Sequence, residues 1–241
     1  MFRNILQSVA KDSDITFSDN QLDQFADFYQ MIVEWNKKIN LTTITDPYEF
    51  AVKHIIDSIL IWNENKIGKV ETIIDVGTGA GFPCIPLKIL NPYIKITLLD
   101  SLNKRISFLE DVVAKIGLQD VLCLHSRAED AAHNPQFRES FDLAVSRAVA
   151  QLNILSEYCL PFVKTGGYFA ALKSSKIDYE LNDAEYAIKL LGGGNIETID
   201  VKLPNGDGRK LIYIKKVVRT PNQFPRKAGL PKKTPLIKKN K

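Results

Sequence analysis

The chain has 241 residues, 45% of them hydrophobic and 25% charged, and a formal net charge of +4, a composition typical of a globular protein. This length allows one sizeable α/β domain with an extension. No window approaches eighteen consecutive apolar residues and the start has no signal-peptide pattern, so we expect no membrane span, no secretion and a cytoplasmic protein.

The first 68 residues predict a helical cap. Ser18-Asp19-Asn20-Gln21 is a capping box, and apolar residues follow it at helical spacing. A second helix is expected from about Pro47 to Asn65, with the proline in its first turn. His54 and Asp57 on this helix could face a cofactor pocket, although a lone histidine on a half-apolar helix is more often a packing residue.

The stretch Thr72–Pro86 organises the domain that follows, which we place at residues 69–218. An apolar run of strand length ends at Asp75, and three alternating glycines then lead to a helix start: Gly77, Gly79 and Gly81. Glycines let the backbone turn sharply and let a ligand approach the main chain. A dinucleotide fingerprint needs its third glycine one residue later. The spacing observed here is instead typical of S-adenosylmethionine-dependent methyltransferases.

A second acid supports a nucleoside ligand. The strand predicted over Ile94–Asp100 also ends in a carboxylate, which falls twenty-three residues after Gly77. An acid at that position accepts hydrogen bonds from ribose hydroxyls, which both NAD and S-adenosylmethionine carry. The glycine spacing favours the latter cofactor.

Strands and helices alternate from residue 70 onward, which predicts a parallel sheet covered on both faces. A helix is expected over Lys104–Ile116, with Gly117 as its stop, and a strand over Asp120–His125. The pair Cys123 and His125 could be half of a metal site, but no second pair exists, so buried residues on a strand are the favoured interpretation and no metal is expected. The other two cysteines offer no disulfide frame.

The exits of the third and fourth strands fall at the edge where open α/β sheets bind ligands. A backbone N–H near Ala128 or Glu129 could read the adenine. The strand Phe141–Val145 leads into Arg147, a candidate for orienting substrate or cofactor; the alternative is a salt bridge from this arginine to Glu129 or Asp130.

The last third of the domain predicts an antiparallel ending. Its expected elements are a helix over Gln151–Val163, a strand over Gly167–Leu172, a helix over Lys176–Leu191, a turn at Gly192–Gly194, and strands over Asn195–Leu203 and Lys210–Val218. Asn205-Gly206-Asp207-Gly208 between the last two strands is a hairpin signal. The predicted fold class is therefore α/β, a Rossmann-like seven-stranded methyltransferase sheet with an antiparallel C-terminal hairpin.

Charge is distributed unevenly along the chain. Twelve Lys or Arg and no acid lie between Arg209 and Lys241, whereas the first 208 residues hold twenty basic and twenty-eight acidic residues. This is the footprint of a nucleic-acid binder, and the alternative is a solvated tail. We assign the basic tail to residues 219–241, with these RNA-binding candidates: Arg219, Arg226, Lys227, Lys232 and Lys233.

Several motifs resemble one bacterial family. They are Trp35-Asn36, Asn40-Leu41-Thr42, His54 with Asp57-Ser58, the loop from Gly77 to Pro86, Leu99-Asp100-Ser101, Lys104-Arg105, Phe141-Asp142, Ser146-Arg147-Ala148 and Pro225-Arg226-Lys227-x-Gly229. With them the chain resembles the small-subunit ribosomal RNA methyltransferase G family, also called glucose-inhibited division protein B. The resemblance covers nearly the whole chain. One departure is Cys84, which stands where the family usually has glycine.

The resemblance implies methyl transfer to N7 of one guanine in the decoding-region loop of 16S ribosomal RNA, presented as naked RNA, an assembling small subunit or a finished one. We expect the protein to act as a monomer. Together with the strand and loop pattern the resemblance puts these residues around S-adenosylmethionine: Asp75, Gly77, Gly79, Phe82, Asp100, Ser101, Leu102, Ala128, Glu129 and Arg147. Because N7 has no proton to lose, no catalytic base is expected. Two alternatives stay open: a small-molecule methyltransferase on the same fold, and a non-catalytic RNA-binding protein that keeps the nucleoside pocket.

Overall fold

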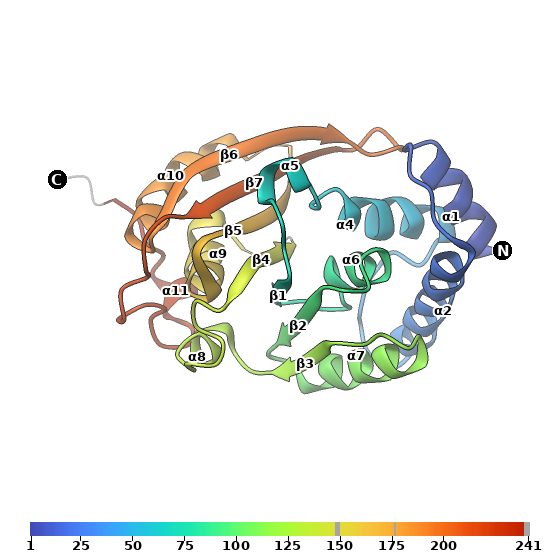
Figure 1. Cartoon of the computed structure of the whole chain (residues 1–241), viewed down its shortest axis with the longest axis horizontal. Helices are drawn as coiled ribbons and strands as arrows, with labels where there is room; N and C mark the ends of the chain where they lie inside the picture. Colours follow the sequence, from blue (N-terminus) through green and yellow to red (C-terminus); the bar gives the residue numbers. More distant parts are fainter. Residues whose placement is uncertain (148–149, 176, 239–241) are drawn as a thin grey trace.

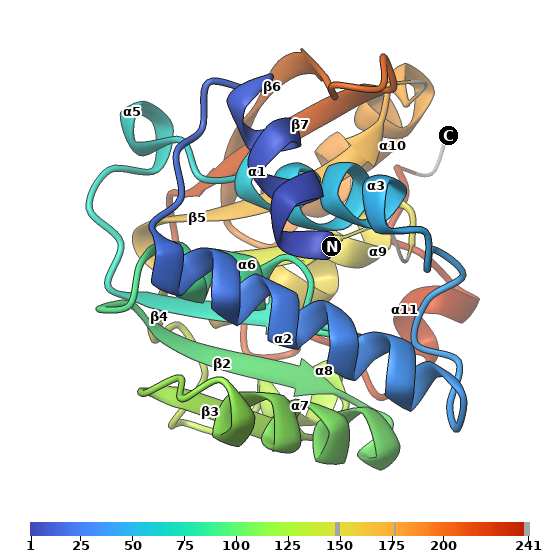
Figure 2. The same cartoon turned by 90° about the vertical axis from the view of Figure 1, so that its right-hand side faces the viewer.

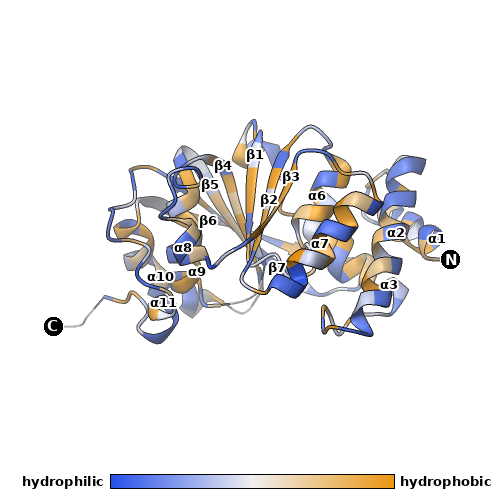
Figure 3. Cartoon of the chain, turned by 90° about the horizontal axis from the view of Figure 1, so that it is seen from below, coloured by the Kyte–Doolittle hydropathy of each residue, from blue (hydrophilic) through white to orange (hydrophobic). Residues whose placement is uncertain are grey.

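The computed structural model describes residues 1–147, 150–175 and 177–238 of the chain. One seven-stranded sheet lies between two layers of helices, as the view from below shows most clearly (Figures 1 and 3). The strand order is β3-β2-β1-β4-β5-β7-β6. The strands are β1 (Thr72–Val76), β2 (Lys95–Asp100), β3 (Val121–His125), β4 (Phe141–Arg147), β5 (Val163–Ser174), β6 (Gly193–Lys202) and β7 (Gly208–Lys216).

Pairing in the sheet follows the predicted plan. Strands β1 to β5 are parallel, and β7 runs antiparallel between β5 and β6. This confirms the predicted α/β fold class with its C-terminal hairpin. Carboxyl ends of the parallel strands therefore meet along one edge, with β1 and β4 at the centre, where the order reverses and ligands bind in such folds.

Alternating side chains along the central strands build two cores. On β1, Ile73 faces one apolar cluster and Ile74 the other, and on β4 Leu143 and Ala144 divide in the same way. Because successive strand residues point to opposite faces, each face needs its own helical cover. Figure 3 shows this as apolar strands enclosed by helices with polar outer surfaces.

One face is covered by helices that follow β1 and β2 and by the N-terminal cap, which shares a single apolar cluster with them (Figures 2 and 3). These elements are α1 (Phe2–Lys11), α2 (Asp19–Asn36), α3 (Pro47–Phe50), the π-helical η1 (Ala51–Ile56), α4 (Asp57–Ile59), α5 (Glu64–Ile67), α6 (Cys84–Leu90) and α7 (Asn103–Lys115). The other face is covered by α8 (Ala128–Ala131), α9 (Leu152–Cys159), η2 (Leu160–Phe162), α10 (Asp178–Leu190) and α11 (Leu230–Lys233). None of the helices in the described ranges is long and apolar enough to cross a membrane.

The cap confirms one expectation and corrects another. Ser18 and Gln21 form the predicted reciprocal capping box at the start of α2. The helix that starts at Pro47 ends at Ile59, so the predicted end at Asn65 was wrong. The backbone carbonyl of Ile61 accepts a hydrogen bond from the Tyr213 hydroxyl of β7 at 3.1 Å. A tertiary contact of this kind captures a carbonyl that a longer helix would have used.

Boundaries in the second half also shift. β4 continues to Arg147, so this arginine is the last residue of a strand and does not follow one. Only Gly192 of the glycine triplet is a turn residue, with φ +88°, because β6 already starts at Gly193. A Cβ on Gly192 would lie 2.2 Å from the Val218 carbonyl oxygen, so the glycine permits a close backbone approach. Ala148 of the arginine motif and Lys176 at the predicted helix start lie outside the described residues.

Candidate functional site

The loop between β1 and α6 forms the centre of the candidate site. Gly77 and Gly79 have φ values of +75° and +62°, which side-chain-bearing residues rarely adopt. The backbone N–H groups of Gly77 and Thr78 both donate to the carbonyl of Leu99 on β2, at 2.9 and 3.1 Å. These bonds hold the loop over the carboxyl ends of β1 and β2, with its glycine backbone open to a ligand.

Asp75 lies directly behind this loop, where its carboxyl group is completely buried. Its Oδ2 accepts hydrogen bonds from the Thr78 hydroxyl at 2.8 Å and from the Cys84 backbone N–H at 3.3 Å. Its Oδ1 has no partner among the described residues. Burial raises the pKa of Asp75 to about 7 despite these bonds. The fully buried Cys84 thiol has a pKa raised well above its usual value by the same burial.

Asp100, at the end of β2, holds the other side of the loop. Its Oδ2 accepts from the Gly79 N–H at 3.0 Å and from Arg105 at 3.2 Å, and its Oδ1 accepts from the Leu102 N–H at 2.9 Å. A carboxylate offers about four acceptor positions, so this one keeps capacity for a further hydroxyl. The neighbouring Ser101 and Leu102 are exposed at the strand exit.

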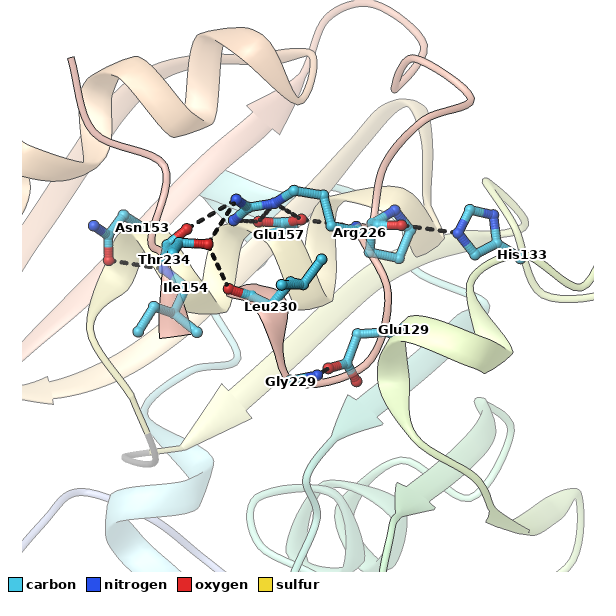
Figure 4. Close-up of polar contacts among 10 residues, drawn as sticks. Glu129, His133, Asn153, Ile154, Glu157, Arg226, Gly229, Leu230 and Thr234 are labelled. Carbon is cyan, nitrogen blue, oxygen red and sulfur yellow. Dashed lines mark hydrogen bonds and ion pairs between the residues drawn. The ribbon is translucent and has the colours of Figure 1, made fainter. Parts of the chain in front are cut away.

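Ala128 and Glu129 form the start of the short helix α8, at the exit of β3. The side chain of Glu129 is buried, and its Oε1 accepts a hydrogen bond from the Gly229 backbone N–H at 2.9 Å (Figure 4). This carboxylate therefore holds the C-terminal segment at the same edge of the sheet as the glycine loop.

Phe82, the residue after the third glycine, is buried under two polar side chains. The ring of His54 stacks on it, with 4.4 Å between ring centroids and 16° between planes. The Arg147 guanidinium carbon lies 4.7 Å from the Phe82 ring centroid, in cation–π geometry. Helix η1 of the cap and strand β4 thus meet on the loop between β1 and α6, which we call the cofactor loop after the ligand that the sequence predicts for it.

Hydrogen bonds define the protonation state of His54. One guanidinium nitrogen of Arg147 lies 3.0 Å from His54 Nδ1, and because arginine can only donate, Nδ1 is the acceptor. Nε2 then carries the proton and donates to the Thr42 hydroxyl at 2.8 Å. Burial first, and then the charge of Arg147, lower the pKa of His54 to about 3. His54 is therefore neutral at physiological pH and joins the cap loop to β4.

Asp57, one helical turn after His54, lies between two arginines. Its Oδ1 accepts from Arg209 Nε at 2.8 Å, and its Oδ2 lies 3.6 Å from Arg147. Arg147 also donates to the Lys53 carbonyl at 3.0 Å. The alternative salt bridge from Arg147 to Glu129 or Asp130 was therefore wrong, because the guanidinium faces the cap.

A cavity of about 570 Å³ opens beside this cluster, between the cap, the ends of β4 and β5, and the start of α10. His54, Asp57 and Arg147 form one of its walls. His54 and Arg147 thus contact both the cavity and Phe82 of the loop between β1 and α6.

The basic end of the chain wraps back onto the body. We define the C-terminal strap as residues 219–234. Its Arg226 donates to the buried Glu157 of α9 from the side-chain Nε and the backbone N–H, at 2.9 and 2.8 Å, and from Nη2 at 2.6 Å (Figure 4). His133 bonds the Pro225 carbonyl at 2.8 Å and anchors the same segment. The charge of Arg226 is thus compensated within the protein, which removes it as a simple phosphate contact.

Other positive charges of the basic end are also paired. Lys216 is fully buried beside Glu139, and burial lowers its pKa to about 8. Arg209 and Lys210 pair with Asp57 and Asp200. Arg219 is exposed and lies 3.9 Å from Glu139, whereas Lys227, Lys232 and Lys233 of the strap are exposed with no ion pair among the described residues. The exposed positive surface is therefore smaller than the sequence count indicates.

The metal alternative finds no support in the described part of the chain, where no group of three or more His, Cys, Asp or Glu side chains could hold an ion. Cys123 is half-buried on β3, and the exposed His125 bonds the Ser101 carbonyl at 3.1 Å. The expectation that both are buried was wrong, since Cys123 is only half-buried and His125 is exposed.

Sequence reasoning missed three residues that bind candidate site residues or line the cavity: Arg209, Glu157 and Glu180. No local pattern marks them: the partners of Arg209 and Glu157 lie far away in the chain, and the cavity that Glu180 lines is built from distant segments. The spacing of His54 and Asp57 was a usable signal, because residues three apart share one face of a helix.

Comparison with known proteins gives the family. Residues 21–213 match the family model described as rRNA small subunit methyltransferase G. The chain is 49% identical over 236 residues to "Ribosomal RNA small subunit methyltransferase G" of Clostridium botulinum (strain Loch Maree / Type A3), covering 98% of this chain and 99% of the relative. It is 47% identical over 232 residues to the protein of the same name from Desulforamulus reducens, covering 96% and 97%.

Solved structures support the fold. A SAM-dependent methyltransferase from Aquifex aeolicus matches with a TM-score of 0.51 and 20% identity, covering 76% of this chain and 98% of that one. Precorrin-6y C5,15-methyltransferase from Geobacter metallireducens matches with a TM-score of 0.51 and 13% identity, covering 74% and 92%. At such identities the likeness concerns the fold alone.

Proposed function

The chain belongs to the rRNA small subunit methyltransferase G family, and we propose that it transfers the methyl group of S-adenosyl-L-methionine to N7 of a guanine in the decoding-region loop of 16S rRNA. The observation that carries this proposal is the glycine loop held between two strand-end acids, Asp75 and Asp100, at the centre of the sheet's carboxyl edge. We further propose a cytoplasmic monomer, with cap (1–68), methyltransferase domain (69–218) and basic tail (219–241).

The residues present fit the cofactor. Asp75 keeps a buried oxygen behind the loop with no hydrogen-bond partner among the described residues, which suits a positively charged ligand, and Asp100 keeps capacity for a ribose hydroxyl. The exposed backbone at Gly77, with the partly exposed Gly79, allows close approach of a ligand. We propose that Phe82, Ser101, Leu102, Ala128 and Glu129 complete this site.

Binding of the cofactor should release a proton from Asp75. Near pH 7 its carboxyl group is about half protonated, and a bound cation favours the ionised form, so about half a proton should leave on binding. Calorimetry in buffers of different ionisation enthalpy measures this release. Because the raised pKa keeps the proton on the free protein, affinity should rise with pH through 7.

Two controls isolate Asp75 in this experiment. S-adenosylhomocysteine lacks the sulfonium charge and should release fewer protons. The Asp75→Asn variant should lose the pH-dependent release altogether. An unchanged proton release in the folded Asp75→Asn protein would assign the titration to another group.

The protein's own contribution to the reaction is placement. The sulfonium of the bound cofactor supplies an activated methyl group, and guanine N7 is a lone-pair acceptor without a proton. Orientation of the two reactants can lower a barrier by several kcal/mol, up to roughly 7 to 11. We propose that Arg147 is a positioning residue. Its guanidinium group donates hydrogen bonds to His54 and to the Lys53 carbonyl, and it lies on the ring of Phe82 in the cofactor loop.

The RNA partner is supported by exposed cations of the strap, which Glu129 and Glu157 fix at the cofactor edge. Side chains cannot enter the deep, narrow major groove of A-form RNA, where N7 lies. An enzyme of this specificity should therefore act on a loop and hold its phosphates with exposed lysines.

Replacing Lys227, Lys232 and Lys233 by glutamine should weaken RNA binding and flatten its salt dependence. Each lost phosphate contact lowers the slope of log K against log salt by about 0.7 to 0.9, so the triple variant should lose about 2 to 3. Filter binding between low and high salt measures the slope, and cofactor affinity should not change.

Lys11, Lys115 and Lys189 are exposed elsewhere and give a matched triple variant of equal charge. This control should keep the slope of the unmodified protein. Equal slopes in both triple variants would mean that RNA docks elsewhere, for example on the cap.

Methyl incorporation from labelled cofactor tests the function itself. Naked 16S rRNA, assembling subunits and finished subunits, all from a strain lacking the protein, should be compared, and the labelled base identified as 7-methylguanine. Incorporation only into a small molecule would favour the alternative methyltransferase. RNA binding without any incorporation would favour the non-catalytic alternative.

A further inference from the structure

Two buried side-chain oxygens lack a hydrogen-bond partner in the described part of the chain: Asp75 Oδ1 and Glu180 Oε2. The first belongs to the cofactor loop. The second lies in the first turn of α10, on a side chain that is only 9% exposed and that lines the 570 Å³ cavity. An unpaired buried carboxylate oxygen is unfavourable unless a donor reaches it. The cavity is the route by which a ligand can bring that donor.

The cavity has the size and position of an acceptor site. Its volume lies within the range of about 300 to 1,000 Å³ that small-ligand pockets take. His54 and Arg147 line it and also pack on Phe82, so it adjoins the cofactor loop. Tyr179, which also lines it, has a side chain that is 68% exposed and offers an aromatic surface at the entrance.

Glu180 forms a largely buried ion pair with Lys173. Its Oε1 accepts a hydrogen bond from the Lys173 ammonium at 3.0 Å, and Lys173 also donates to the Ala150 carbonyl. The lysine is 10% exposed, so both groups are largely shielded from water. The pair therefore places a donor cation at one wall of the cavity, beside a carboxylate oxygen that has no hydrogen-bond partner among the described residues.

This pair matches the Watson–Crick edge of guanine. That edge offers an acceptor at O6 next to donors at N1 and N2, so the lysine can donate to O6 while Glu180 accepts from N1–H and N2–H. Adenine reverses the pattern at two of these positions, with a donor at N6 and an acceptor at N1, and would face like groups. A site that hydrogen-bonds a substrate group strongly rejects the analogue lacking it.

We propose that the cavity holds the acceptor guanine, that Glu180 with Lys173 reads its Watson–Crick edge, and that Tyr179 stacks on the base at the entrance. This inference rests on the proposed function and specifies its base recognition. N7 lies on the neighbouring Hoogsteen edge, outside the N1–H and N2–H groups that Glu180 would bind, and stays free for the reaction. Because the Watson–Crick edge is accessible only in an unpaired base, the target must be single-stranded or extruded when it binds.

Inosine at the target position tests the reading of the base, because it keeps N7, O6 and N1–H and lacks only the 2-amino group. The substrate is 16S rRNA ligated to carry guanosine or inosine there, presented both free and in reconstituted subunits. The unmodified protein should methylate inosine RNA about 10- to 100-fold more slowly than guanosine RNA in a single turnover, because inosine loses the hydrogen bond from the 2-amino group to the charged Glu180.

Glu180→Gln identifies the reader. The glutamine NH2 group is a donor and would face the N1–H or N2–H donors of guanine, so the rate of transfer to guanosine RNA should fall by at least about 10-fold. The rate difference between guanosine and inosine RNA should then largely disappear. Glu185→Gln, on the exposed part of the same helix, is the matched control and should behave as the unmodified protein with both RNAs. Calorimetric cofactor affinity, unchanged in both variants, checks the fold.

A second variant keeps the test decisive if Glu180→Gln fails to fold. Tyr179→Ala changes an exposed side chain and should weaken transfer about 10-fold through lost stacking on the base. No inosine penalty in the unmodified protein, or an equal penalty in Glu180→Gln, would overturn this inference alone. If the unmodified protein failed to methylate even the guanosine RNA, the proposed function itself would be overturned.

Discussion

Replacing Arg147 by lysine should slow methyl transfer about 100-fold at saturating RNA and cofactor, because it removes at least one of two charge-assisted hydrogen bonds worth about 1.5 to 3 kcal/mol each. One bond holds His54 Nδ1 and the other holds the Lys53 carbonyl. An ammonium cannot keep both contacts and also lie flat on Phe82. Single-turnover kinetics measures the rate, and calorimetry shows whether cofactor affinity falls with it.

Arg209→Lys is the matched control for this variant. Arg209 donates one hydrogen bond from Nε to Asp57, and a lysine ammonium can replace this bond. The transfer rate of the Arg209→Lys protein should therefore stay within about tenfold of that of the unmodified protein. An Arg147→Lys protein with the normal rate would show that the two guanidinium hydrogen bonds are dispensable.

The pH dependence separates positioning from base catalysis. The pKa of His54 is lowered to about 3, so this ring is neutral throughout the working range and its charge does not change there. At saturating cofactor the transfer rate should therefore be flat between about pH 6.5 and 8.5. A steep rise with pH that disappears in His54→Phe would contradict the base-free reaction and point to an acceptor other than N7.

Replacing Glu157 by glutamine should lower the free energy of unfolding by about 3 to 5 kcal/mol, since it leaves the Arg226 charge without its buried partner. Glu157 is 1% exposed and Arg226 24% exposed, so water compensates little of the loss. The melting temperature should fall by on the order of 10 °C. The C-terminal strap should also become sensitive to limited proteolysis.

Two further variants define the origin of this effect. The double variant Glu157→Gln with Arg226→Met removes both members of the pair and should recover much of the stability, because no uncompensated charge remains. Glu110→Gln, an exposed glutamate of α7, should change stability by less than about 0.5 kcal/mol. A double variant as unstable as Glu157→Gln alone would show that packing of the strap, and not charge, dominates.

The sequence by itself determined the fold class and the position of the glycine loop between β1 and α6. Asp75 and Asp100 end strands whose apolar runs are local patterns, and the glycines between them need positive φ whatever surrounds them. The C-terminal hairpin followed in the same way from turn chemistry. Such features depend on neighbouring residues only, so one chain was enough to predict them.

Only the tertiary structure decided which charges are free and which are paired. Arg226 looks like a phosphate contact in a basic tail, yet its partner Glu157 lies 69 residues earlier. Arg147 bonds His54, 93 residues away, and Glu180 acquires its importance from a cavity built by four separate segments. The sequence gives the charge of a side chain, whereas long-range packing decides whether that charge is buried and whether it is paired. Burial and pairing in turn decide whether an ionic group stabilises the fold or remains available to a ligand.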